Sequence, residues 1–219
     1  MKIIGLPDIH GDQQRLKKLA SRLSEVDLVL LIGDITNFGQ APEMQQAIEF
    51  VQKMNPNCIT VPGNCDFPET EAVMTSTRTN LNGGTRLIDN LLFVGLGASL
   101  ATPSNATPYE VEESYFEEKL ALVEADLGGD YPLVMVSHQP PHGCLADALG
   151  NGMHVGSSTV RRFIERHQPL VCFTGHIHEG KGIDWIGQTR VINPGPVFQG
   201  NYAYAEIDRD IKHLEIRSI

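Results

Sequence analysis

Short hydrophobic runs alternate with helix-like stripes along most of the chain. Mostly apolar runs of four to six residues, typical of strands buried in a sheet, lie at 2–6, 27–32, 58–61, 91–96, 133–136 and 170–173. Between these runs, apolar residues recur every three or four positions. This spacing predicts helices over 12–26, 42–51, 69–77, 113–124 and 157–164. Pro42 suits the first turn of the second helix, and Ser157 or Ser158 is a candidate cap for the last.

Hairpins replace this alternation in the last part of the chain. Apolar segments at 183–186 and 189–192 flank one short turn, and segments at 202–207 and 212–216 flank another. Alternating strands and helices followed by hairpins predict an α/β fold, a four-layer α-β-β-α sandwich of two packed mixed sheets flanked by helices. The chain shows no repeat, low-complexity tract or linker, so we expect a single domain over 1–219.

Size and composition narrow the class of protein. The chain has 219 residues, of which 41% are hydrophobic and 20% charged, as in an ordinary globular protein with a well-buried core. Its apolar stretches are much shorter than the ~20 residues that span a bilayer. The first residues run straight into a predicted strand and lack the apolar core of a signal peptide. We therefore expect a cytoplasmic protein with no membrane partner.

Cysteine spacing and net charge exclude further classes. The four cysteines form no Cys-x-x-Cys pair, which argues against zinc knuckles and dithiol redox motifs and fits reduced thiols. The formal net charge of −10 opposes a general nucleic-acid-binding surface, so we expect no stable nucleic-acid binding. Bound divalent cations would still reverse the field locally.

Five short polar motifs each follow an apolar run. Functional residues in open α/β sheets gather beyond the carboxyl ends of strands, so we expect these motifs to lie close together. Two Asp, one Asn and four His among them suit two adjacent metal ions held by oxygen and imidazole ligands. Taken singly, each residue fits a turn, a helix cap or a structural histidine equally well. The motifs are Asp8-Ile9-His10, Gly33-Asp34, Gly63-Asn64-Cys65-Asp66, Ser137-His138 and Gly175-His176-Ile177-His178.

The order and contexts of these motifs resemble the calcineurin-like metallophosphoesterase superfamily. The pattern there is D-x-H, GD, GN[HC][DE], a separate H and GHxH. The resemblance spans residues 3 to 196, and the stretch from His138 to Gly195 looks like the small prokaryotic phosphoesterases of this group. It implies hydrolysis of a phosphoester at a pair of metal ions.

The resemblance also implies a ligand set for two divalent or trivalent metal ions. A carboxylate has two oxygens to share, whereas neutral imidazole and amide oxygen are terminal donors, so Asp34 would bridge the ions. The ions would lie roughly 3.5–4 Å apart, and a bridging water acidified to hydroxide would attack the phosphorus. Such ligands accept Mn, which we expect first, and also Fe, Zn, Co or Ni. The terminal ligands would be Asp8, His10 and His178 for one ion and Asn64, His138 and His176 for the other.

Cys65 departs from the commonest family pattern. Many superfamily members have His there, which donates a proton to the leaving group, and Cys is a weaker donor with an ordinary pKa of ~8.5. Cys65 is therefore either a small residue in the wall of the site, which we favour, or a catalytic thiol. Sequences with Cys at this position look like phosphodiesterases, so we expect a preference for good leaving groups. Asp66 either orients its neighbours from behind the ligands or makes an ordinary turn.

The segment 139–156 carries glycines, prolines and two further histidines. Long connections of this kind often shape a site, so we expect it to wall the substrate pocket. His154, ahead of His142, could replace the missing proton donor as a catalytic residue. The competing interpretation is an ordinary surface histidine, which is common in loops.

Two functions of different kinds compete. The leading hypothesis is a dinuclear metal-dependent phosphoesterase that acts on a small phosphodiester or an activated phosphomonoester. A phosphoprotein phosphatase fits less well, because that branch uses GDxVDRG and GNHE, which differ from the segments 33–39 and 63–66 here. The alternative is a catalytically weak metal-binding scaffold of the same fold, although every implied ligand position here carries a competent residue. The physiological substrate and the oligomeric state stay open.

Overall fold

Two large mixed sheets form the centre of the molecule in the computed structural model, which describes residues 1–102 and 104–219. The first sheet has the order β13-β12-β1-β2-β3. Strands β1, β2 and β3 are parallel, whereas β12 runs antiparallel to β1 and β13 antiparallel to β12. The bounds are β1 Lys2–Leu6, β2 Leu28–Ile32, β3 Cys58–Val61, β12 Asn201–Ile207 and β13 Ile211–Ser218.

The second sheet has the order β10-β11-β9-β8-β5-β4. Its inner strands β11, β9, β8 and β5 are parallel, and β10 and β4 pair antiparallel at the two edges. The bounds are β4 Thr85–Ile88, β5 Leu91–Leu96, β8 Leu133–Ser137, β9 Val171–Thr174, β10 Gly182–Ile186 and β11 Thr189–Asn193. A separate short pair consists of β6 (Ser99–Leu100) and β7 (Glu110–Val111).

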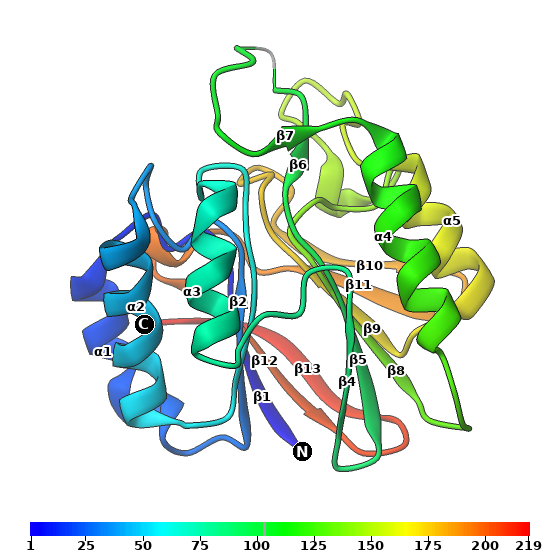
Figure 1. Ribbon diagram of the computed structural model, residues 1–219. Helices are drawn as coiled ribbons and strands as arrows, with labels where there is room; N and C mark the ends of the chain where they lie inside the picture. The colour runs from blue at the N-terminus through cyan, green and yellow to red at the C-terminus, as the bar shows by residue number, and fades with distance from the viewer. Residues whose placement is uncertain (103) are drawn as a thin grey trace.

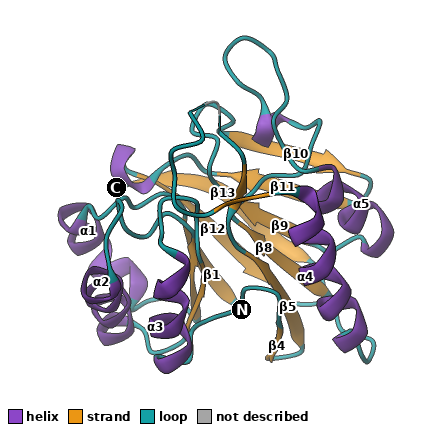
Figure 2. Ribbon diagram, turned by 45° about the horizontal axis from the view of Figure 1, so that its top comes forward, coloured by secondary structure: helices purple, strands orange, loops and turns teal. Residues whose placement is uncertain are grey.

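Helices cover the outer face of each sheet (Figures 1 and 2). Helices α1 (Gln13–Leu23), α2 (Ala41–Met54) and α3 (Glu71–Ser76) lie against the first sheet, and α4 (Glu113–Asp126) and α5 (Ser158–His167) against the second. Short 3-10 turns lie at η1 (Pro68–Thr70), η2 (Leu145–Asp147) and η3 (Val197–Gln199). Three buried hydrophobic clusters separate the layers, one under each set of helices and one between the sheets.

The predicted four-layer α-β-β-α sandwich is confirmed. In α2, the buried residues are the four that the helical spacing places inward, Met44, Ala47, Ile48 and Val51. Both predicted hairpins form, as β10–β11 and β12–β13, and Ser157 caps α5 by accepting a hydrogen bond from the Val160 amide. Because β12–β13 joins the first sheet and β10–β11 the second, the final hairpins extend both layers.

Four details differ from the sequence prediction. The first helix ends at Leu23 rather than Val26, and the predicted helix at 69–77 is a 3-10 turn followed by six helical residues. Strand β4 was not predicted, because its residues lie half-exposed at a sheet edge and lack a clear alternation of apolar and polar positions. The pair β6–β7 was not predicted either, since two-residue strands leave no periodic pattern.

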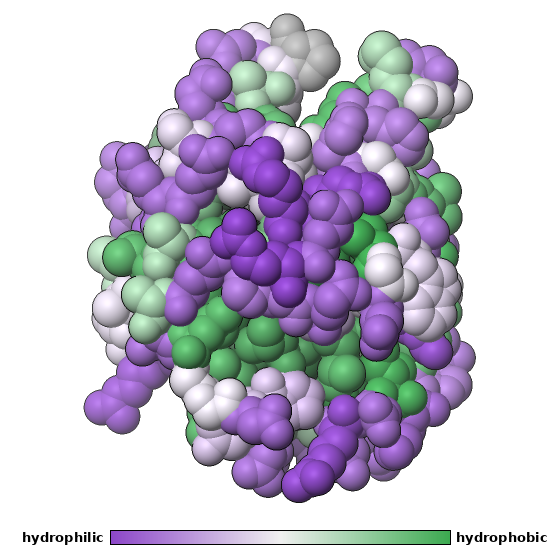
Figure 3. Space-filling view, turned by 90° about the vertical axis from the view of Figure 1, so that its right-hand side faces the viewer, coloured by the Kyte–Doolittle hydropathy of each residue, from purple (hydrophilic) through white to green (hydrophobic). Residues whose placement is uncertain are grey.

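The molecular surface mixes hydrophilic and hydrophobic areas. On the face shown in Figure 3, a dense strip of hydrophilic side chains lies above a band of exposed hydrophobic ones. Within the described residues, no helix reaches the combination of length and hydrophobicity that a bilayer-spanning segment needs.

Glu113 joins the two helices that cover the second sheet. Its carboxylate, at the start of α4, accepts hydrogen bonds at the N-terminus of α5 from Ser157 Oγ (2.6 Å), the Ser158 amide (2.8 Å) and the Thr159 amide (3.2 Å). A negative charge there satisfies free amides and complements the helix dipole. Burial alone would raise the pKa of Glu113, but these hydrogen bonds lower it below its ordinary value.

Replacing Glu113 with Gln is expected to lower the free energy of unfolding by about 1–3 kcal/mol at pH 7, because charged hydrogen bonds are lost. The depressed pKa makes this contribution fully present above the ordinary glutamate pKa and removes it as pH falls through the folded-state value. Urea unfolding of both proteins at several pH values measures the difference. Glu118→Gln, an exposed change on the same helix, is the control. A Glu113→Gln effect that stays constant down to the acid limit would contradict this account.

Candidate metal centre

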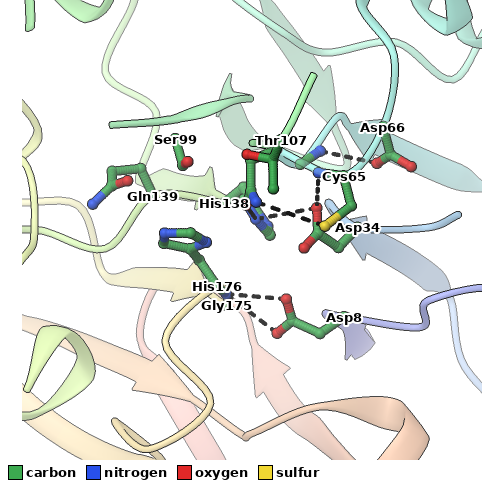
Figure 4. A network of polar contacts seen from close by, with 12 residues as sticks. Asp8, Asp34, Cys65, Asp66, Ser99, Thr107, His138, Gln139, Gly175 and His176 are labelled. Atoms are coloured by element: carbon green, nitrogen blue, oxygen red, sulfur yellow. Dashed lines mark hydrogen bonds and ion pairs between the residues drawn. The ribbon is translucent and has the colours of Figure 1, made fainter. Parts of the chain in front are cut away.

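The seven predicted ligands lie at one end of the sandwich, where the carboxyl ends of strands from both sheets meet. The loops after β1, β2 and β3 supply residues from the first sheet, and those after β8 and β9 supply residues from the second. Figure 4 shows several of these side chains converging between the layers. The residues are Asp8 and His10 after β1, Asp34 after β2, Asn64 after β3, His138 after β8, and His176 and His178 after β9.

One group of donors comes from Asp8, His10 and His178. Their possible ligand atoms all lie within 4.8 Å of one another. The Nε2 atom of His178 is 3.7 Å from Asp8 Oδ1, and the His10 and His178 rings meet edge to face at 5.6 Å. These are the three side chains that the family resemblance assigns to one ion.

A second group of donors surrounds His138. Its Nε2 atom is 3.0 Å from Asn64 Oδ1, and its ring centroid is 5.2 Å from that of His176. Its other nitrogen, Nδ1, lies 2.8 Å from the carbonyl oxygen of Ile32. Because that oxygen only accepts, Nδ1 donates to it, and this contact orients the ring so that Nε2 faces the oxygen of Asn64.

Asp34 lies between the two groups. Its Oδ1 atom is 3.5 Å from His138 Nε2, and its Oδ2 atom is 3.5 Å from His10 Nε2. The backbone amide of Cys65 donates a 2.8 Å hydrogen bond to Oδ1 and fixes the carboxylate. One oxygen of Asp34 therefore faces each donor group.

The buried polar atoms around Asp8, His10 and Asp34 are suited to bind cations. The Nε2 atom of His10 is buried and has no hydrogen-bond partner among the described residues. Asp8 and Asp34 are almost fully buried, at 0% and 2% exposure, yet among the described residues no Lys or Arg pairs with either. Buried carboxylates cost several kcal/mol without a compensating positive charge. Buried carboxylates and imidazoles gathered in this way make a donor set that suits bound cations.

The protonation states of two site histidines, His10 and His176, favour metal ligation. Burial lowers the pKa of His176 to about 3, and burial also lowers the pKa of His10, so both imidazoles are neutral at pH 7. Burial raises the pKa of Asp34, with Asp8 adding to the effect against the opposing charge of His138. A cation beside Asp34 would lower that pKa again and keep the carboxylate ionised.

Four of the seven residues adopt positive φ angles, a conformation that non-glycine residues rarely take. The loops are held in this shape by backbone bonds between neighbouring motifs, including Asp8 N to Gly33 O (3.1 Å) and His10 N to Asp34 O (2.8 Å). Strained backbone at several ligand positions turns the side chains inward from the strand ends. The residues and angles are Asp8 at 52°, His10 at 47°, Asp34 at 47° and His176 at 67°.

Two motif glycines allow ligands from neighbouring strands to approach closely. A methyl group at Gly33 would overlap the His138 ring, and Gly33 also has a φ of +77°. A methyl group at Gly63 would overlap the Asp34 carboxylate and backbone amide. The glycines before Asp34 and Asn64 therefore make room for a predicted ligand that another strand supplies.

Asp66 positions the loops that carry Asp34 and Asn64. Its fully buried carboxylate accepts hydrogen bonds from the Ile35 amide (3.1 Å), the Thr36 amide and hydroxyl (both 2.8 Å) and the Gly63 amide (2.9 Å). Burial and the nearby Asp34 raise the pKa of Asp66 to about 6 against the opposing effect of these donors. Of the two roles that the sequence left open, the contacts favour orientation of the Asp34 and Asn64 loops.

Two further supporting residues had weak sequence signals. Asn193 is fully buried and donates a 2.7 Å hydrogen bond to the carbonyl of Ile177, which lies between two of the predicted ligand histidines. Phe198 was not predicted at all, and its ring packs edge to face against His10 at 5.4 Å and His178 at 5.2 Å. Phe198 comes from η3, so only the folded chain brings it to the site.

Cys65 lies beside the ligands. Its sulfur is within 4.8 Å of ligand atoms of His10 and Asp34, and the side chain is 7% exposed. Burial, together with the charge of Asp34, raises the pKa of Cys65 far above its ordinary value, so the group is a neutral thiol at pH 7. The Asn64 side-chain amide also contacts this sulfur at 3.6 Å.

His154 belongs to a different polar cluster. Its Nδ1 atom is 2.7 Å from the buried Asp147, and His142 Nδ1 is 3.5 Å from the same carboxylate. Among the described residues, no hydrogen bond or ion pair joins His154 to the seven predicted ligands. Its catalytic role stays a prediction.

Comparisons with known proteins give the wider context. The family model of the calcineurin-like phosphoesterases matches residues 1–180. An uncharacterised protein of Methanocaldococcus jannaschii is 38% identical over 205 residues, covering 90% of this chain and 88% of that protein. The 3′,5′-cyclic adenosine monophosphate phosphodiesterase CpdA of Escherichia coli is 22% identical over 202 residues, covering 90% of this chain and 70% of CpdA.

The fold agrees with these matches. The solved structure of TT1561 from Thermus thermophilus superposes with a TM-score of 0.76 at 22% identity, over 99% of this chain and 98% of that one. The chain therefore belongs to the calcineurin-like phosphoesterase family, as its motifs indicate. This family comprises hydrolases of phosphoesters that normally bind two metal ions.

Replacing Asp66 with Asn is expected to lower the free energy of unfolding by about 2–3 kcal/mol, since an amide group cannot accept from donors on both sides. Because the Asp34 and Asn64 loops would shift, manganese affinity should fall about 10- to 100-fold. Urea unfolding and isothermal titration with Mn²⁺ measure the two effects. Asp208→Asn, in the exposed turn between β12 and β13, is the control. Unchanged manganese affinity in Asp66→Asn would show that the carboxylate does not position the ligands.

Proposed function

We propose that the chain is a dinuclear metal-dependent phosphoesterase that hydrolyses a small phosphodiester or an activated phosphomonoester. The observation that carries the proposal is the position of Asp34, with one carboxylate oxygen 3.5 Å from a histidine of each donor group. Three terminal donors on either side of one shared carboxylate suit two adjacent cations. The proposed ligands are Asp8, His10 and His178 for one, Asn64, His138 and His176 for the other, and Asp34 for both.

Two bound cations would supply Lewis acidity, which activates water near neutral pH and neutralises charge on the phosphoryl oxygens. The mixture of carboxylate, amide and imidazole donors favours Mn and also accepts Fe, Zn, Co or Ni. The surrounding protein residues orient the proposed metal ligands. Ile32 fixes the tautomer of His138, the Cys65 amide fixes Asp34, and Asp66 holds the two loops in place.

The preference for a phosphodiester rests on Cys65. As a buried neutral thiol of raised pKa, it is a poor proton donor to a departing alkoxide. Esters with good leaving groups need no such donor, because the departing group is stable as an anion. The similarity to CpdA, a cyclic nucleotide phosphodiesterase, supports the same preference.

A catalytically weak scaffold is the alternative function. Loss of the metal ligands would favour it, whereas this chain keeps a competent donor at all seven positions. The two proposals differ in one measurable property, which is metal-dependent turnover of a phosphoester.

Metal-stripped protein should be inactive on bis(p-nitrophenyl) phosphate and regain activity when Mn²⁺ is added. Asp34→Asn removes one of the two bridging oxygens and should lower kcat at least about 100-fold while the fold is retained. Release of p-nitrophenolate measures turnover, and circular dichroism checks folding. The exposed Asp208→Asn variant should keep wild-type activity. Absence of metal-dependent hydrolysis with any phosphoester would favour the scaffold.

Cys65→His should change substrate preference. An imidazole can protonate a poor leaving group, so hydrolysis of alkyl phosphate esters should rise about 10-fold or more relative to aryl esters. Cys65→Ala is the matched control, because it removes the thiol and adds no proton donor. The ratio of kcat/KM for alkyl and aryl esters is the quantity measured. An unchanged ratio in Cys65→His would refute the explanation of Cys65.

A further inference from the structure

A second feature of the molecule adjoins the candidate metal centre. A cavity of about 360 Å³ opens beside His176, and most of its lining is apolar, including Leu100, Leu149, Val155 and Ile177. In Figure 4 the His176 ring extends from its backbone toward Gln139, which also lines this cavity, while its amide faces Asp8. The cavity volume lies in the ~300–1,000 Å³ range of small-molecule pockets.

Gln139 ties two walls of the cavity together. Its buried side chain accepts a 2.9 Å hydrogen bond from the Leu100 amide and donates one of 3.1 Å to the carbonyl oxygen of Val155. The segment at 100–102 and the loop carrying Val155 are thus fixed relative to each other by one amide group. The pocket is shaped before a ligand arrives.

Asp147 fixes the loop that forms the outer wall. Its fully buried carboxylate accepts hydrogen bonds from the amides of Gly143 (3.0 Å), Cys144 (2.9 Å) and Gly156 (2.9 Å), and it contacts His154. These bonds close the loop from which Leu149 and Val155 line the cavity. The cluster that holds His154 therefore supports the wall of this pocket.

We propose that this cavity binds an apolar ring or alkyl group of the substrate, esterified to the phosphate that lies at the metal centre. No Lys, Arg, Asp or Glu is among its described lining residues, so the pocket offers no partner for a second charged group. Burial of apolar surface supplies the binding energy. The substrate class is a phosphodiester with one compact hydrophobic substituent, and this assignment rests on the proposed phosphoesterase function.

Two diesters with the same leaving group test the assignment. Benzyl p-nitrophenyl phosphate and methyl p-nitrophenyl phosphate are both alkyl esters, and their uncatalysed hydrolysis calibrates intrinsic reactivity. With manganese-loaded protein, the benzyl ester should show a kcat/KM at least about 10-fold higher than the methyl ester, after this calibration. Equal values would overturn the pocket assignment and leave the phosphoesterase function intact.

Two variants test whether the preference for the benzyl ester arises from this cavity. Leu149→Asn and Val155→Thr exchange apolar wall atoms for polar ones of similar size, and each should lower the benzyl-to-methyl ratio at least about 3-fold. Met153→Asn lies in the same loop, but its side chain is 55% exposed and does not line the cavity. This control should keep the ratio. A ratio that is insensitive to both wall variants, or that falls equally in Met153→Asn, would refute the assignment.

Ligand binding provides a readout that does not need turnover. Benzylphosphonate should raise the melting temperature of the manganese-loaded protein more than methylphosphonate, and Leu149→Asn should abolish the difference. If neither diester is hydrolysed, the proposed function is contradicted. The two phosphonates alone then test the pocket assignment. Equal stabilisation by both phosphonates would overturn the pocket assignment.

Discussion

The burial of two carboxylates that have no Lys or Arg partner among the described residues is the constraint on which the rest of the site depends. Asp8 and Asp34 are enclosed where two sheets meet, and the contacts around them come from histidines and backbone amides instead of Lys or Arg among the described residues. An apolar interior does not tolerate such charges unless positive charge compensates them. The Nε2 atoms of His10 and His138 each lie 3.5 Å from an oxygen of Asp34. The two proposed cations would satisfy all of these groups at once.

The fold supplies this arrangement because parallel strands of both sheets end at the same edge. Short loops then reverse direction through strained backbone at Asp8, His10, Asp34 and His176, and bonds between neighbouring motifs hold them. Asp66 and Asn193 anchor the loops from behind, and glycines leave room for ligands from adjacent strands. The strain is local, whereas the hydrophobic clusters that compensate for it extend through all four layers.

Much of the fold could be predicted from sequence, because buried strands and amphipathic helices carry strong periodic patterns. Strand β4 could not, since an exposed edge strand has little hydrophobic signal. Motif spacing placed the seven candidate ligands at strand ends, and the folded chain brings them together, but their role as ligands stays a prediction. The contributions of Phe198 and Asn193 depend on packing between segments far apart in the sequence. The apolar cavity beside His176 likewise exists only when three separate loops meet.

Asp34 is proposed to lie between two metal ions. Crystals grown from metal-stripped protein and soaked in MnCl₂, with diffraction data collected near the manganese absorption edge, test this position directly. Two anomalous peaks are expected on either side of the Asp34 carboxylate, one bounded by Asp8, His10 and His178 and the other by Asn64, His138 and His176. A single peak, or peaks away from Asp34 in crystals that retain the fold, would contradict it.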